Sequence, residues 1–358
     1  MTRPHSGKAD ITVRGGGIFG LSAAWALVRR GAKVQVVETR HLGAGASGGI
    51  VGALTPHVPE AWNEKKAFQL ESLLLAPEWW AKVGEAAQRA TGYAPIGRLQ
   101  ALDDAAAVAL AQARSEGARA LWQGRAEWSV VPSTGAPWEP LSATGHLVHD
   151  TLSARITPRL ALDALASALR ALGAQIILGE CEDQGLVVWA NGTDGLEALS
   201  ADKQRDVGGA VKGQAALLAF QADGLPQIYA DGLHIVPHGA GLVAIGSTSE
   251  HSWSDPSSTD ALLDALIARA RAALPALHDA PVVERWAGLR PRAASRAPVA
   301  GAWPDRPDHF ILNGGFKIGF GMAPLLAERM ADLILTGQAS LPTSFSPEQA
   351  LAKAKTRP

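Results

Sequence analysis

ITVRGGGIFGLSAAWALVRRGAKVQVVE, residues 11–38, has the most informative pattern of hydrophobic residues and glycines in the chain. A short β-like run, Ile11 to Arg14, leads into three glycines, and residues 21–30 then show helical spacing that stops at Gly31. KVQVVE, residues 33–38, has the composition of a second strand. The order strand, glycine turn, helix and strand predicts the opening βαβ unit of a doubly wound α/β domain.

Three glycines in this unit have the G-x-G-x-x-G spacing of dinucleotide-binding loops. Gly15 permits a tight turn, Gly17 lets backbone N–H groups approach a pyrophosphate, and Gly20 allows close packing of helix on strand. Glu38, at the end of the second strand, can accept hydrogen bonds from an adenosine ribose. These residues predict a dinucleotide site but do not distinguish FAD from NAD.

A second glycine-rich stretch, HLGAGASGGIVGALTPH, occupies residues 41–57. So bare a backbone suits close passage along a long ligand, and Ser47 adds a hydroxyl that can reach a pyrophosphate or a flavin. The stretch therefore favours FAD, and a mobile surface loop is the alternative.

The last third of the chain contains WAGLRPRAASRAPVAG, residues 286–301, followed by the loop NGGFKIGFG, residues 313–321. We expect a helix from Pro324 to Thr336, ended by Gly337, with the proline at its first position. The partial positive charge at its start would face the flavin edge where negative charge gathers on reduction. An ordinary capped surface helix is the alternative.

The remaining segments alternate in character. Residues 63–90 predict helices, one of them beginning at Pro77, and several short alternating runs between residues 212 and 248 predict an antiparallel sheet. We therefore expect an FAD-binding Rossmann-like doubly wound domain interwoven with an antiparallel-sheet substrate domain. The expected boundaries are 1–80, 150–210 and 284–345 for the FAD-binding domain, 81–149 and 211–283 for the substrate domain, and 346–358 for a frayed tail.

Composition excludes several classes of protein. The net charge is −1 and no Lys/Arg block occurs, so we expect no nucleic-acid partner. The single cysteine, Cys181, excludes an internal disulfide and a cysteine-based metal cage. Residues 1–10 are polar and no stretch approaches the roughly 20 apolar residues of a membrane span. We expect a cytoplasmic protein without a metal, and a homo-oligomer stays open.

The βαβ unit, GAGASG, GLRP and GGFKIGFGMAP occur here in the order seen in the D-amino-acid oxidase superfamily. Over nearly its whole length the sequence resembles the glycine-oxidase- and sarcosine-oxidase-like branch. The resemblance implies that Arg290, in GLRP, clamps a substrate carboxylate. Lys317 falls where glycine oxidases place an active-site arginine, and His234 where a tyrosine usually helps to hold the carboxylate. A structural ion-pair role for Arg290 and an ordinary strand role for His234 are the alternatives.

The resemblance also implies a set of cofactor contacts. The family's A-[ST]-G turn is matched by Ala190, Asn191 and Gly192. The expected FAD-binding residues are Gly15, Gly17, Ile18, Phe19, Gly20, Glu38, Thr39, Arg40, Ala46, Ser47, Gly48, Ala190, Gly192, Gly315, Phe316, Lys317, Ile318 and Gly319. We expect FAD to be held non-covalently, because the sarcosine-oxidase-type cysteine near residue 300 is missing.

Eleven tryptophans against two tyrosines is an unusual aromatic balance. Trp62, Trp79, Trp80 and Trp253 fall in segments that could cover the site. One or two of them could form a cage for an alkylated ammonium, although most are expected in the core.

Together these features predict an FAD-dependent amine or amino-acid oxidase or dehydrogenase. It would remove a hydride from the carbon next to the nitrogen of a small amino acid or N-alkyl amino acid. The imine would hydrolyse to an oxo acid, and O2 or another acceptor would reoxidise the flavin. One alternative is the FAD half of the enzyme that trims a carboxymethylaminomethyl group on tRNA wobble uridine, whose GASG…GALYP stretch is similar to GASGGIVGALTPH. The other is a flavin-binding subunit without independent turnover.

Overall fold

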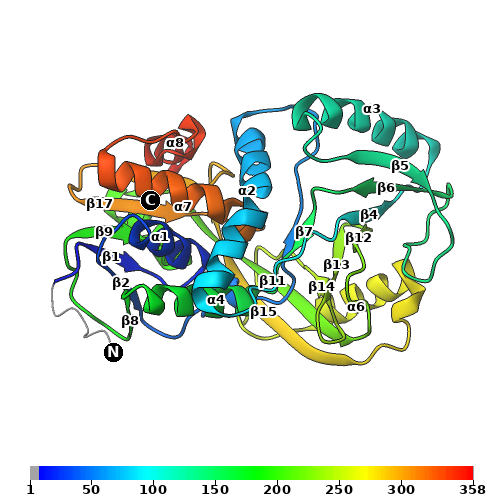
Figure 1. The fold of residues 1–358 in the computed structure, drawn as a ribbon, viewed down its shortest axis with the longest axis horizontal. Coiled ribbons are helices and arrows are strands. Elements are labelled where there is room, and N and C mark those ends of the chain that lie inside the picture. The colour runs from blue at the N-terminus through cyan, green and yellow to red at the C-terminus, as the bar shows by residue number, and fades with distance from the viewer. Residues whose placement is uncertain (1–7, 358) are drawn as a thin grey trace.

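The computed structural model describes residues 8–357, which form two halves, each built on its own large sheet (Figure 1). One half contains a six-stranded, mostly parallel sheet and the other an eight-stranded, mostly antiparallel sheet. This architecture confirms the predicted combination of a doubly wound domain and an antiparallel-sheet domain. Most of the polar N-terminal stretch, residues 1–7, lies outside the described residues.

The six-stranded sheet has β1 near its centre, paired in parallel with β2 and β9. In spatial order its strands are β16 (Val299–Ala302), β17 (His309–Asn313), β9 (Leu186–Trp189), β1 (Ile11–Arg14), β2 (Val34–Glu38) and β8 (Gln175–Leu178). The helices α1 (Ile18–Val28), α4 (Pro158–Ala171) and α7 (Gly319–Thr336) pack beside it, α1 touching the other two (Figure 1). Because α1 is apolar on all sides, it is buried almost entirely.

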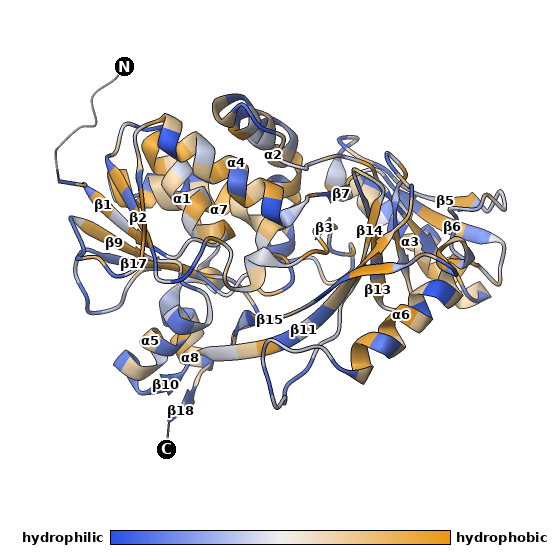
Figure 2. Ribbon diagram, turned by 90° about the horizontal axis from the view of Figure 1, so that it is seen from below, coloured by the Kyte–Doolittle hydropathy of each residue, from blue (hydrophilic) through white to orange (hydrophobic). Residues whose placement is uncertain are grey.

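The eight-stranded sheet carries the second half. In spatial order its strands are β15 (Val282–Ala293), β11 (Gly208–Ala219), β14 (Leu242–Gly246), β13 (Leu233–His238), β12 (Gln227–Ala230), β4 (Arg98–Ala101), β6 (His146–Asp150) and β5 (Trp128–Pro132). Two helices pack on this half, α3 (Ala105–Trp122) against β5 and α6 (Ala261–Ala273) against β11 and β14. Figure 2 shows the long strands β11 and β15 running from this sheet towards the six-stranded half. Through them the second sheet reaches the edge of the first.

Two predicted helix starts were wrong. α2 (Glu64–Ala87) runs through Pro77 without a break, and α7 begins at Gly319, so that Pro324 lies inside it. A proline inside a helix removes one backbone hydrogen bond. Buried neighbours on both sides of each proline, such as Ala76 and Trp79 in α2, compensate through packing.

The C-terminal segment, expected to be frayed, is ordered. Within residues 346–357 it forms α8 (Pro347–Lys353) and β18 (Lys355–Thr356), and β18 pairs with β10 (Arg205–Asp206); η3 (Thr343–Phe345) directly precedes it. Phe345 is fully buried and meets Phe68 edge-on, with ring centroids 5.3 Å apart. This apolar anchor and the strand pair hold the segment on the six-stranded half.

The remaining elements are short, apart from α5. They are η1 (Ala46–Gly48), β3 (Ala53–Leu54), β7 (Ala154–Arg155), α5 (Thr193–Lys203) and η2 (Pro275–Leu277). No helix within residues 8–357 has both the length and the apolar character that a membrane crossing requires.

Candidate active site

A cavity of about 600 Å³ is walled by segments of both halves. It runs from the carboxyl ends of β1, β2 and β9 to the strands β12 and β13, so elements of both sheets contribute to one space. All of the predicted site residues line it except Gly20 and Gly48. The cavity therefore brings together residues from the two ends of the chain, such as Gly15 and Gly319.

The first glycine turn has the geometry that its spacing predicts. Gly15 has φ of +113°, and a Cβ atom there would lie 2.5 Å from the carbonyl oxygen of Ala190. A Cβ atom on Gly20 would collide with the carbonyl oxygen of Gly15. Gly20 therefore acts by letting α1 pack against β1, which explains why it does not line the cavity.

The start of α1 is held by the second glycine-rich stretch. The N–H of Ile18 donates a hydrogen bond to the Ser47 hydroxyl oxygen at 3.0 Å. Gly48 packs tightly on Gly43, where a side chain would not fit, and so shapes this loop from behind. Gly17 precedes α1 in extended conformation, and the first-turn N–H groups that follow lack intrahelical partners. Such a turn is suited to a pyrophosphate.

Glu38 is buried at the end of β2 and fixes the turn beside it. Its Oε2 atom accepts a hydrogen bond from the N–H of Gly16 at 2.8 Å, and Oε1 accepts one from the N–H of Arg40 at 3.0 Å. Each carboxylate oxygen can accept a further bond. The carboxylate can thus serve the fold and a ribose hydroxyl together, with Thr39 and Arg40 exposed at the rim.

The turn after β9 contains an unsatisfied polar atom. The Oδ1 atom of Asn191 is enclosed and has no hydrogen-bond partner among the described residues, although Asn191 lines the cavity. Asn313 steadies this turn by donating a hydrogen bond to the carbonyl oxygen of Gly192 at 2.8 Å. Buried acceptors are usually satisfied, so this atom indicates a donor-bearing ligand at the turn. The glycine cradle, Glu38 and Asn191 together fit FAD.

The loop before α7 forms another wall. Gly315 lies against Phe19, since a Cβ atom at 315 would be 2.8 Å from the Phe19 ring. Phe316 has φ of +44°, and Ile318 and Gly319 begin the helix. The positive end of α7 therefore borders the cavity, as predicted, although the helix starts five residues earlier than expected.

Arg290 projects from β15 into the cavity wall and is only 7% exposed. Its Nη1 atom donates to the Ser247 hydroxyl at 2.8 Å, and Nη2 donates to the carbonyl oxygens of Lys212 at 3.1 Å and Thr248 at 2.6 Å. All of these acceptors are neutral, and Nε has no partner among the described residues. Burial lowers the pKa of Arg290 to about 10, against the opposing effect of Glu250. Within residues 8–357 no carboxylate forms an ion pair with Arg290, and its guanidinium is a desolvated cation.

Lys317 borders the same end of the cavity. Its Nζ atom lies 5.8 Å from the centre of the Phe316 ring, and the guanidinium carbons of Arg290 and Arg292 both lie 5.4 Å from that centre. The pKa of Lys317 is lowered by partial burial and then by repulsion from Arg290 and Arg292. Three cations therefore surround one aromatic ring, and two of them, Arg290 and Lys317, line the cavity.

His234 lies at the same end but is not charged near neutral pH. Burial, with smaller repulsions from Arg98 and Lys317, lowers its pKa to about 3. Its Nδ1 atom is enclosed without a partner among the described residues. Directly across the hairpin lies Tyr229, whose ring centre is 5.0 Å from that of His234, and both side chains line the cavity. The cavity lining thus contains a tyrosine beside this histidine.

Sequence reasoning missed Tyr229, Ser247 and Trp286. Tyr229 had a usable signal, because the two-residue turn Asp231–Gly232 predicts a hairpin that pairs positions 229 and 234. Ser247 and Trp286 had no comparable local signal.

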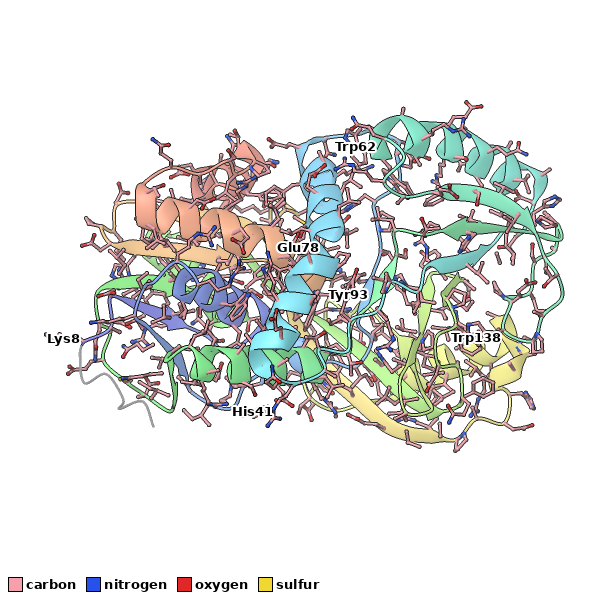
Figure 3. All side chains as sticks on the ribbon, in the orientation of Figure 1. Lys8, His41, Trp62, Glu78, Tyr93 and Trp138 are labelled. Atoms are coloured by element: carbon pink, nitrogen blue, oxygen red, sulfur yellow. The ribbon has the colours of Figure 1, made fainter. Side chains whose placement is uncertain are left out.

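The tryptophan hypothesis was wrong in its residues. Trp79 and Trp80 are buried in the core, and Trp62 lies near the N-terminal end of α2 (Figure 3). Neither these residues nor Trp253 borders the cavity in the described part of the chain, whereas Trp286 does. The lining therefore shows no tryptophan cage for an ammonium group.

Comparison with known proteins places this chain in a family. The family model of FAD dependent oxidoreductases (DAO) matches residues 10–333. The glycine oxidase of Pseudomonas putida is 29% identical over 373 residues, covering 95% of this chain and 98% of that protein. The tRNA 5-methylaminomethyl-2-thiouridine biosynthesis bifunctional protein MnmC of Maricaulis maris is 29% identical over 339 residues, covering 92% of this chain and 53% of that protein. The chain thus spans about half the length of this bifunctional relative.

The fold agrees with that assignment. The crystal structure of glycine oxidase from Geobacillus kaustophilus superposes with a TM-score of 0.83 at 21% identity, covering 94% of this chain and 98% of that chain. The sequence, the fold and the dinucleotide cradle lead to one conclusion. The chain belongs to the DAO family of FAD-dependent oxidoreductases, and FAD is its cofactor.

Proposed function

We propose that this protein oxidises a small amino acid or N-alkyl amino acid at the carbon next to the nitrogen. The observation that carries the proposal is the Arg290 guanidinium, which is buried at the cavity wall and has only neutral acceptors. A desolvated cation of this kind favours a carboxylate, which it can bind through two parallel hydrogen bonds. Similarity to glycine oxidases supports the same substrate class.

The protein's own contribution is binding and orientation. Arg290 would hold the carboxylate while Tyr229 and His234 close the other side, so that the substrate carbon is fixed in one orientation. FAD, held non-covalently, would supply the hydride acceptor. His234 is too weak a base to take the amine proton, because its pKa is about 3. The proton would leave to water, and the imine would hydrolyse to an oxo acid and an amine or ammonia.

Anaerobic reduction tests this proposal. Purified yellow protein is mixed with glycine, sarcosine, proline and D- and L-amino acids while the flavin absorbance band is followed. Bleaching by one group supports the proposal and identifies the class. A yellow protein that none of these amines bleaches contradicts the proposal and favours a flavin-binding subunit. If an amine does bleach the flavin, admitting O2 to the reduced protein identifies or excludes oxygen as the acceptor.

The tRNA-trimming function is the second candidate, because the MnmC relative matches 92% of this chain. Phosphate-backbone binding would require a cationic surface, whereas the net charge here is −1. Retention of tRNA that weakens steeply between low and high salt would favour this candidate. Absence of retention at low salt would remove it.

A further inference from the structure

We propose that the preferred substrate is an amine that carries two carboxylates, one bound by Arg290 and the second by Lys317. The inference deepens the proposed function and rests on it. Its basis is the charge balance at the end of the cavity that Arg290 and Lys317 share.

The carboxylates of the cavity lining lie at the opposite end. They are Glu38 at the end of β2, Glu180 just after β8 and Asp194 in the first turn of α5. All three therefore belong to the six-stranded half, where the dinucleotide cradle is. Among the described lining residues, the side with Tyr229 and His234 has two cations and no carboxylate.

Glu250 is the acid that affects the pKa of Arg290, but it interacts with other residues. Glu250 accepts a hydrogen bond from the Gln214 amide at 3.1 Å and lies 3.8 Å from the Lys212 ammonium. Lys212 is itself fully buried, so Glu250 serves chiefly to neutralise it. The positive charge of Arg290 therefore remains available to a ligand.

Lys317 is exposed, and it forms no ion pair with an acid within residues 8–357. The charged groups that perturb it are both cations, Arg290 and Arg292. One bound carboxylate would offset the charge of Arg290 and leave Lys317 repelled by Arg292. A second carboxylate removes this remaining imbalance, and the flexible ammonium of Lys317 can follow a group whose position differs from that of the first.

His234 and Tyr229 complete the recognition of an extended anion. His234 stays neutral and adds no charge, while its enclosed Nδ1 atom can accept a hydrogen bond from a ligand or a water. Tyr229 contributes a phenolic hydroxyl. The end of the cavity thus offers two cations with neutral polar groups beside them, which suits two anionic groups on one small molecule.

Binding of unreactive analogues tests the inference separately from turnover. Diglycolate and methoxyacetate have an ether oxygen in place of the amine and differ by one carboxylate. Titrated into holoprotein at low salt and followed by the flavin spectrum, diglycolate should bind at least 10-fold more tightly. That preference should shrink at 0.5 M salt, because the second contact is electrostatic and partly exposed.

Variants identify the group responsible. Lys317→Met should reduce the diglycolate preference to about 1, Lys317→Arg should restore most of it, and Lys82→Met, on the outside of α2, should leave it intact. Equal affinities in the wild type overturn the inference. So does an equal loss of both ligands in Lys317→Met, which would assign Lys317 to the shared carboxylate or to the flavin.

Turnover of two reactive amines tests the inference in a second way. Iminodiacetate and sarcosine are the reactive counterparts, and iminodiacetate should have the higher kcat/KM. Bleaching by sarcosine with no advantage for iminodiacetate overturns the inference but leaves the proposed function standing. A diglycolate preference without bleaching by any amine contradicts the proposed function while supporting the two-carboxylate site.

Discussion

The two ends of the cavity are built in different ways. The proposed cofactor end is made largely from backbone, with the glycine turn at residues 15–20, the loop at 46–48 and the turn at 190–192, and with Glu38 as its main side chain. The substrate end is made from side chains, with Arg290, Lys317 and the Tyr229–His234 pair arriving from separate strands and loops. The proposed cofactor end depends on close backbone approaches, as at Gly15 and Gly20, whereas the proposed substrate end can vary by single substitutions.

This difference predicts different responses to mutation. Changes at the cofactor end should affect folding and flavin content together, because the same atoms pack the sheet. Changes at the substrate end should affect kinetics and leave the yellow holoprotein intact.

The largest effect is expected for Gly20→Val. The added side chain would collide with the Gly15 carbonyl, separate α1 from β1 and cost about 3 kcal/mol, with loss of bound FAD. Flavin content measures the loss of FAD, and urea unfolding measures the loss of stability. Gly239→Ala, where a Cβ atom meets open space, is the control. A yellow Gly20→Val protein of wild-type stability would contradict the packing role.

Next comes Arg290→Ala. Loss of the buried cation should lower kcat/KM for carboxylated amines about 10²- to 10³-fold, mainly through KM, while flavin content stays unchanged. Arg285→Ala, on the exposed part of the same strand, is the matched control. Unchanged kinetics would show that Arg290 does not bind the substrate, and would contradict the proposed difference between the two ends of the cavity.

A smaller effect is expected for the pH dependence of stability, through His238. The ring of His238 lies 3.1 Å from the Thr157 hydroxyl and 3.1 Å from the carbonyl of Ile50, and Ile50 lines the cavity. Burial lowers the pKa of His238 to about 4 from its ordinary 6.5. Below pH 6.5 the unfolded state therefore binds more protons, and stability falls as the pH drops towards 4.

The slope due to this histidine should approach 1.4 kcal/mol per pH unit, and His234 adds to it in the same window. Urea unfolding at pH 7, 6 and 5 measures the slope. His238→Gln should flatten it. A slope that the variant shares in full with the wild type would show that His238 is not the titrating group.

The smallest effect is expected for Tyr229→Phe. Losing one hydrogen bond to a ligand should weaken methoxyacetate binding about 3- to 10-fold. Tyr93, the chain's other tyrosine, does not line the cavity, and Tyr93→Phe is a direct control (Figure 3). Equal affinities in both variants would exclude Tyr229 from carboxylate recognition.

The cofactor end could be predicted from sequence because its signals are local. Glycine spacing, a strand before it and Glu38 after it lie within 28 residues, and each has a steric or electrostatic reason. The turn at Ala190 was predicted by family resemblance, and the loop before α7 from its own glycines and the helix that follows it. Helix boundaries failed at Pro77 and Pro324, where burial outweighed the local preference of proline.

The substrate end could be predicted only in part. Arg290 followed from a motif, but its neutral acceptors come from strands that pair across some 40 to 80 residues, which no local pattern records. Trp286 likewise reaches the cavity through the long register of β15 on β11. The tryptophan segments misled because their spacing is equally typical of a core, and the core is where Trp79 and Trp80 lie.

The hairpin that presents Tyr229 and His234 has an evolutionary consequence. Six consecutive residues, 229–234, encode both side chains and the exposed turn that pairs them. A single short mutational cassette can therefore exchange one wall of the pocket while the glycine cradle stays untouched. Selection on a library of such cassettes could change the substrate preference without loss of flavin binding.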